Sequence, residues 1–259
     1  MTYILLFGHA GQTFLNTFNN DKHEHDNQVL LKSIQGPTDM FLPSGESIPH
    51  EAIRLMVADL DERYPEDINL FIDTYTSIIQ KFEGKTDKYG PELIMTLPSD
   101  QRMDEEIPTC VHGMLEKIQT RGKLVSFIGI NRDEYENGCA ELALEILNYN
   151  SMIKTSGAVR IRWDDFISLA NHRYGNLHLA TEGDIFSSAL TVLKSVDWRN
   201  AYHVLLNMIT QDSVKLSELS DAAKVIDERL NVDHPEAPLI WNHYNGECTR
   251  TSLLVFRDM

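Results

Sequence analysis

Strand-length apolar runs alternate with helical patterns along almost the whole chain, and this alternation limits the folds open to it. It predicts an α/β protein: a Rossmann-like, mostly parallel sheet with helices on both faces. Expected strands of the first part are Tyr3–Phe7, Gln28–Ser33, Leu93–Leu97, Lys123–Ile130 and Ala158–Trp163. Expected helices are Gly11–Phe18, Glu51–Arg63, Glu66–Phe82, Pro108–Thr120 and Cys139–Tyr149.

The pattern changes near Tyr174, where helices and closely spaced strands follow one another. We therefore predict a first domain over residues 1–174 and a smaller α+β carboxy-terminal domain over residues 175–259. Helices are expected at Asp164–Arg173, Asp184–Val196 and Ser217–Leu230, and strands at Tyr202–Ile209, Leu239–His243 and Thr251–Phe256.

The charge balance argues against polyanionic partners. Lys and Arg number 23 against 39 Asp and Glu, so the formal net charge is -16. Nucleic acid would be repelled, and we expect no nucleic-acid binding. The longest apolar runs have strand length, and the chain opens on a strand rather than a signal sequence, so we expect no membrane insertion and a cytoplasmic location. The odd number of cysteines, 3, suggests reduced thiols.

Glycines and amides follow the first strand. Gly8, Gly11, Gln12 and Asn16 lie where a helix begins, and a helix amino terminus can bind a phosphate or a base. Glycines after a strand are also ordinary turn residues. Both interpretations stay open at this point.

Acidic and histidine-containing segments offer other candidate sites. Asp164 and Asp165 have the residue types for acid-base chemistry, but such a pair commonly caps a helix. His23-Glu24-His25-Asp26 has metal-ligand residue types, yet its Asn-rich setting is that of a solvated loop, so no metal site is predicted. The acidic run Pro98–Glu106 is interpreted as a helix start, with Ser99 or Asp100 as the cap.

Several segments, in order, resemble the tubulin/FtsZ superfamily. The run Gly8–Asn16 looks like the first nucleotide loop of FtsZ, and Asp133–Gly138 resembles the family's phenylalanine-glutamate-glycine turn. Val204–Thr210 is similar to the VLVNITG strand of FtsZ, followed by a helix and a final hairpin that ends at Phe256. The resemblance implies a shortened tubulin/FtsZ-like fold, with GTP and Mg²⁺ as a possible cofactor and Asp165 as the hydrolysis-triggering aspartate.

The resemblance is absent at the segment that corresponds to the family's phosphate-binding loop. Pro98–Glu106 stands in place of the family's GGGTGTG loop and contains no glycine, although Pro108 matches the proline that follows that loop. Glycines let such a loop aim backbone N–H groups at phosphate. Arg160 and Arg162 replace the acidic and amide partners of the triggering aspartate, and the family's long central helix is expected to be shortened or lost.

The sequence thus predicts a tubulin/FtsZ-like structural protein that self-associates into filaments or docks on a protein partner, with little or no GTPase activity and no cofactor. One alternative is a GTP-binding, polymerising GTPase with an unusual phosphate loop. Another is an unrelated nucleotide- or metabolite-binding α/β protein.

Overall fold

The computed structural model describes residues 2–20, 29–36, 39, 53–58, 65–80, 93–99, 125–131, 173–211, 214–246 and 248–258. The chain divides into two compact units, Met1–Ala143 and Leu144–Met259, here called unit 1 and unit 2. The domain boundary predicted at residue 174 stays a prediction; in the structure that residue lies within a strand of unit 2. Among the described helices, none combines the length and apolarity needed to cross a membrane.

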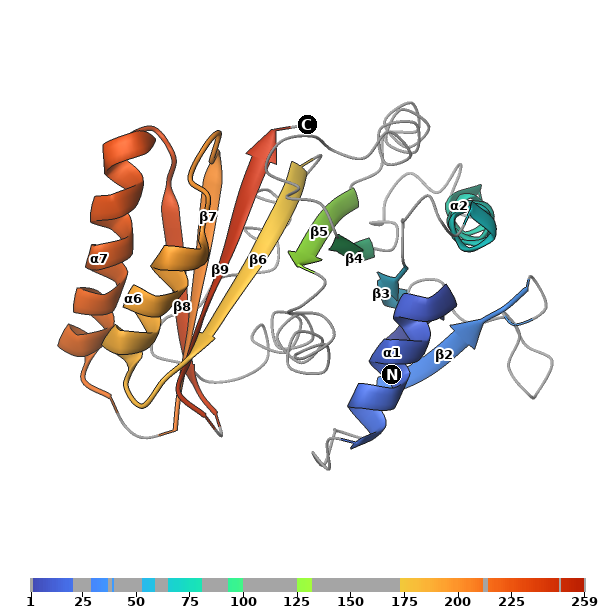
Figure 1. The fold of residues 1–259 in the computed structure, drawn as a ribbon, viewed down its shortest axis with the longest axis horizontal. Coiled ribbons are helices and arrows are strands. Elements are labelled where there is room, and N and C mark those ends of the chain that lie inside the picture. Colours follow the sequence, from blue (N-terminus) through green and yellow to red (C-terminus); the bar gives the residue numbers. More distant parts are fainter. Residues whose placement is uncertain are drawn as a thin grey trace. The chain divides into compact units, whose positions relative to one another are not determined.

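Unit 1 is built on a parallel sheet (Figure 1). Its strands lie in the order β2-β1-β3-β4-β5. The bounds are β1 Thr2–Phe7, α1 Gly8–Asn20, β2 Val29–Ile34, β3 Ile53–Val57, α2 Pro65–Gln80, β4 Leu93–Ser99 and β5 Val125–Asn131.

Helices cover both faces of the unit 1 sheet, as predicted. Gly11 of α1 packs on Leu6, whereas Phe71 of α2 packs edge-to-face on Phe7, with ring centroids 5.4 Å apart. Successive residues of a strand point to opposite faces, so α1 and α2 lie on opposite sides of β1. This is the doubly wound arrangement expected from the alternating pattern.

One predicted helix of unit 1 is wrong. The segment Glu51–Arg63 was expected to be helical, but Ile53–Val57 forms strand β3, between β1 and β4. Met56, Val57 and Ala58 are fully buried, as in a central strand covered on both faces. A short apolar run does not distinguish a buried strand from a helix, so its neighbours in the sheet decide.

Unit 2 is a mixed sheet with two helices on one face. The strand order is β6-β9-β7-β8, with β7 parallel to β8 and β9 antiparallel to both β6 and β7. Figure 1 shows α6 and α7 side by side over this sheet. The bounds are β6 Arg173–Thr181, α6 Ile185–Ser195, β7 His203–Thr210, α7 Leu216–Asp233, β8 Leu239–Asn245 and β9 Arg250–Asp258.

The helices of unit 2 are fixed by caps and a shared core. Asp184 Oδ1 accepts a hydrogen bond from Ser187 N at 2.9 Å and caps α6. The hydrogen bond that the Ser187 hydroxyl donates to Asp184 Oδ2 at 2.6 Å, together with this backbone bond, holds the pKa of Asp184 below its usual range. Buried apolar residues of both helices pack on one face of β7 and β9, namely Ala189, Val192, Leu219, Ala222, Ile226, Leu230, Val204, Leu206, Met208, Leu253 and Val255.

Two features of unit 2 differ from the predictions. Strand β6 was not expected; Gly175 lies within it because a side chain there would meet Leu254 and Phe256. The final hairpin is also wrong, because β9 does not pair with β8: β7 lies between them. Residues 251 to 257 of β9 are all buried, which suits an inner strand, whereas β8 is partly exposed at the end of the strand order.

Candidate functional site

The topology of unit 1 has a switch point at the carboxyl ends of β1 and β3. The chain runs from β1 outward to β2 and then returns to β3 on the other side of β1. In doubly wound sheets ligands bind outside the carboxyl ends of the strands at this switch point. The predicted residues Gly8, Gly11, Gln12 and Asn16 all belong to α1, which directly follows β1.

Both glycines are required by the geometry of the turn. Gly8 has a φ of 56°, in the left-handed region that side chains disfavour. At Gly11, a Cβ would lie 2.7 Å from the backbone carbonyl carbon of Leu6, so the helix can approach β1 this closely because no side chain intervenes. The glycines are thus structural parts of the turn, whether or not a ligand binds there.

The two amides lie on one exposed side of α1. Gln12 Nε2 donates a hydrogen bond to Asn16 Oδ1 at 2.9 Å, the spacing of neighbours four residues apart on a helix. Each amide retains donor and acceptor capacity that suits a base or a sugar hydroxyl. The structure therefore brings the predicted set together on one helix.

A carboxylate that sequence reasoning missed lies against this turn. Asp67, in the first turn of α2, approaches Gly8 so closely that a Cβ on Gly8 would collide with its carboxyl group. Two like unit charges about 4 Å apart repel by roughly 4 kcal/mol at an effective dielectric constant near 20. A phosphate at the start of α1 would meet this repulsion. The sequence shows Asp67 as a favourable first-turn acid of α2, but not its proximity to Gly8.

The predicted helix start at the acidic run is partly wrong. Pro98 and Ser99 belong to β4, paired in register with Ile130 and Asn131 of β5, so Ser99 ends a strand. The pairing of β4 with β3 ends at Thr96. The missing N–H of Pro98 therefore leaves no gap in the ladder with β3.

Other candidates lie outside the described residues. These are Asp164 and Asp165, the segment His23–Asp26, the residues after Ser99 in the acidic run, and the place of the family's central helix. In the described part of the chain, no group of three or more His, Cys, Asp or Glu residues is arranged to hold a metal ion.

Comparisons with known proteins find similarity in structure rather than in sequence. No family model matches the chain, and no curated protein matches it by sequence. FtsZ from M. jannaschii superposes with a TM-score of 0.58 at 10% identity, over 100% of this chain and 90% of that one.

Two further solved structures give the same picture. CetZ from Methanosaeta thermophila superposes with a TM-score of 0.60 at 10% identity, over 98% of this chain and 85% of that one. The structure of GDP-form TubZ protofilaments from Bacillus thuringiensis superposes with a TM-score of 0.59 at 11% identity, over 100% of this chain and 89% of that one. An unrelated α/β architecture is therefore not supported: this chain has the fold of the tubulin/FtsZ superfamily, with a carboxylate beside its first strand-to-helix turn.

Proposed function

We propose that this chain is a tubulin/FtsZ-like structural protein that self-assembles or docks on a protein partner, with a degenerate nucleotide site and little or no GTPase activity. The observation that supports a degenerate nucleotide site is the position of the Asp67 carboxylate, which lies against Gly8. Helix amino termini bind phosphate through N–H groups and a positive dipole end. A carboxylate at the same turn opposes both effects.

The sequence after β4 adds to this argument. Asp100, Asp104, Glu105 and Glu106 follow the strand directly, without a glycine among them. Loops that wrap phosphate depend on glycine for close backbone approach. Two separate segments thus place acids at positions where the resemblance implies phosphate contacts.

The assembly half of the proposal has a different basis. The fold is shared with a TubZ whose structure is of GDP-form protofilaments. A chain that keeps the strands and helices of that fold while altering its nucleotide turn suits a role in which the fold is used for contacts between proteins.

The second candidate function, a GTP-binding polymerising GTPase, is favoured by one observation. Gly8 and Gly11 keep the tight turn, and the exposed pair Gln12 and Asn16 offers hydrogen-bonding groups beside it. A Mg²⁺ ion between Asp67 and a phosphate would convert the carboxylate from a repelling group into a ligand.

Titration calorimetry of GTP into the nucleotide-stripped protein, with Mg²⁺ present, separates the two functions. We expect no detectable binding by the wild-type chain and binding by Asp67→Asn that is stronger by at least about tenfold, because a like charge is removed. Asp73→Asn, an exposed change on the same helix, is the matched control and should behave as wild type.

Micromolar binding by the wild-type chain would favour the GTPase instead. The GTPase function would then also require GTP hydrolysis that rises with protein concentration and is abolished in Asp165→Ala. Sedimentation of the wild-type chain tests assembly independently of nucleotide.

A further inference from the structure

Strand β8 ends in an asparagine–glycine pair. Asn245 is the last residue of β8, and Gly246 follows it directly. The Asn245 side chain is exposed, although its register partner on β7, Thr210, is buried. The backbone nitrogen of the next residue can attack the side-chain carbonyl carbon of an asparagine. A glycine at that position has no side chain to hinder the attack, and its backbone adopts the required conformation readily. Asn245 therefore has an unhindered nucleophile beside it.

The other described asparagines of unit 2 lack this neighbour. Each is followed by a residue with a side chain, and those in the strands are also buried. The buried ones are Asn176, Asn207 and Asn242, and the exposed ones are Asn200 and Asn231. Among the described asparagines of unit 2, only Asn245 combines exposure with a following glycine.

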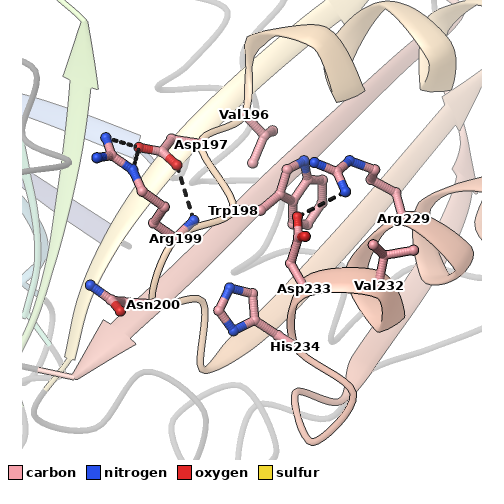
Figure 2. A pocket seen from close by; sticks show the side chains of 9 residues that line it. All are labelled: Val196, Asp197, Trp198, Arg199, Asn200, Arg229, Val232, Asp233 and His234. Atoms are coloured by element: carbon pink, nitrogen blue, oxygen red, sulfur yellow. Dashed lines mark hydrogen bonds and ion pairs between the residues drawn. The ribbon is translucent and has the colours of Figure 1, made fainter.

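Asn200 is the exposed asparagine of a loop and the closest comparison to Asn245. Figure 2 shows it on the lining of a hollow of about 610 Å³ between the segment 196–200 and the last turn of α7. The residue that follows, Ala201, is buried, and its N–H donates to Trp198 O at 3.2 Å. The nitrogen after Asn200 thus belongs to a buried residue with a Cβ, whereas Gly246 is partly exposed and has none.

One hydrogen bond restrains Gly246 in the folded chain. Its N–H donates to Thr210 O at 2.9 Å, at the end of the β7–β8 ladder. While this bond is made, the Gly246 nitrogen is held by Thr210 rather than free to approach the Asn245 side chain. Among the described strands β8 pairs only with β7, and Asn245 is its last paired residue, so this end can open without unfolding the rest of unit 2. The bond therefore slows the attack without preventing it.

We propose that Asn245 is a site of spontaneous deamidation and isoaspartate formation. The Gly246 nitrogen loses its proton to water and bonds to Asn245 Cγ, and the Cγ–Nδ2 bond breaks as ammonia leaves. A cyclic succinimide results. Water then opens the ring at Cγ, which gives aspartate, or at the main-chain carbonyl carbon, which gives isoaspartate. Overall one water is consumed and one ammonia is released, with no oxidation or reduction.

The two products affect the end of β8 differently. In isoaspartate the main chain runs through Cγ, so the backbone gains one carbon between residues 245 and 246. The Gly246 N–H then shifts relative to Thr210 O, and the last ladder bond is lost. Aspartate leaves the main-chain path unchanged and adds only a negative charge to a chain of net charge -16. The modification concerns unit 2 alone and goes beyond the proposed function, on which it does not depend.

Peptide mass spectrometry of the folded wild-type chain, incubated in mildly alkaline buffer, tests the proposal. Trypsin releases residues 230–250 as one peptide, which holds Asn231, Asn242 and Asn245. Conversion at Asn245 should be at least about tenfold faster than at the other two, which corresponds to a barrier lower by about 1.4 kcal/mol. The second asparagine–glycine pair of the sequence, at residues 137–138, lies outside the described residues and falls in a separate peptide.

Gly246→Ala is the variant that isolates the nucleophile. Among the described glycines only Gly8 has a positive φ, so alanine suits the backbone at 246 and the variant should fold as wild type, which circular dichroism checks. The added methyl group hinders the nitrogen, and conversion at Asn245 should slow at least about tenfold. Wild type unfolded in urea should convert about fivefold faster than the folded chain, since one backbone hydrogen bond no longer has to open.

Hydrogen exchange compares the two products. The purified isoaspartate form should exchange faster than wild type at the end of β8, because the bond from Gly246 to Thr210 is lost. Asn245→Asp carries the new charge on an unaltered main chain, so it is the matched control and should exchange as wild type.

Each measurement has an outcome that contradicts the proposal. Conversion at Asn245 no faster than at Asn242 in the folded chain would overturn it, and so would conversion confined to urea. A folded Gly246→Ala that converts as fast as wild type would overturn the role of the Gly246 nitrogen. Equal exchange by the isoaspartate form and Asn245→Asp would overturn the loss of the ladder bond.

Discussion

Units 1 and 2 each join a buried strand to a helix, and the amino end of that helix meets a carboxylate of different origin in each unit. In unit 1, α1 begins at the residue after β1, and the carboxylate at its amino end comes from another helix, through Asp67. In unit 2, five residues separate β7 from α7, and Glu218 of the helix itself accepts a hydrogen bond from Lys215 N at 3.0 Å. The first amino end depends on tertiary packing; the second is closed locally and presents Leu216 to solvent.

The interiors of the units differ as well. His178 on β6 is partly buried, with its Nε2 enclosed and without a hydrogen-bond partner, and its Nδ1 lies 3.4 Å from Ser195 Oγ. Burial, aided by the charge of Arg257 and opposed by Asp197, lowers the pKa of His178 to about 4. His9, in the described part of unit 1, is exposed. Unit 2 is thus expected to lose stability in acid.

The largest expected effect is acid destabilisation of unit 2. His178 binds its proton more weakly in the folded state, so its contribution is present above pH 6.5 and lost as the pH falls toward 4. The loss amounts to up to about 3 kcal/mol. All three tryptophans, Trp163, Trp198 and Trp241, belong to unit 2, so urea unfolding followed by tryptophan fluorescence measures it.

His178→Gln should flatten that pH dependence while leaving stability at pH 7.5 within about 1 kcal/mol of wild type. Burial also lowers the pKa of His243, so a smaller slope of the same sign should remain. An unchanged slope in His178→Gln would mean that the imidazole titrates as freely in the folded chain as in the unfolded one.

Next in size is Gly11→Ala in unit 1. Because the new Cβ would lie 2.7 Å from backbone of Leu6, α1 must shift away from β1, at a cost of about 1–3 kcal/mol. Circular dichroism during urea unfolding measures the loss. A neutral result would show that the close approach of α1 to β1 is not needed for stability.

Gly8→Ala should cost about 1–2 kcal/mol, from its positive φ and from the collision with Asp67. Removing the carboxyl group in Gly8→Ala/Asp67→Ala should recover the part due to the collision and leave the part due to φ. The double-mutant cycle therefore measures how closely the two groups are coupled. Strict additivity would contradict the contact between them.

The smallest effect is expected for Glu218→Ala in unit 2. Loss of the hydrogen bond to Lys215 N should cost about 1 kcal/mol, as for other helix caps. Glu218→Gln, which can still accept that bond, should retain most of the stability. A loss in Glu218→Ala as large as that in Gly8→Ala would erase the distinction between a locally closed helix end and one that depends on packing.

Much of the architecture could be predicted because its signals are local. Helix α2 follows from apolar residues repeated at three and four, and β7 from an apolar run interrupted by Asn207. Strands β1, β2, β4 and β5 and helices α6 and α7 also lie within a few residues of their predicted bounds. The glycine and amide positions of the candidate site were proposed for the same reason, since a turn after a strand has a distinctive composition; their binding role stays a prediction.

Long-range pairing is what sequence reasoning missed. β3 was mistaken for a helix because its five residues carry no periodicity of their own; its burial between β1 and β4 makes it a strand. The short link between β8 and β9 suggested a hairpin, yet β9 lies between β6 and β7, and its seven consecutive buried residues suit that inner position. Pairing depends on partners far along the chain, which local composition does not encode.

The sequence by itself determined that this chain alternates strands and helices, that its first turn is made of glycine, and that acids follow β4. Tertiary structure decided that Asp67 lies beside Gly8, although 59 positions separate them, and that the loop before β7 meets the end of α7 to form a hollow. The physical reason is the range of the forces: backbone preference and periodicity act over a few residues, whereas charge repulsion and burial act between whatever groups the fold brings together.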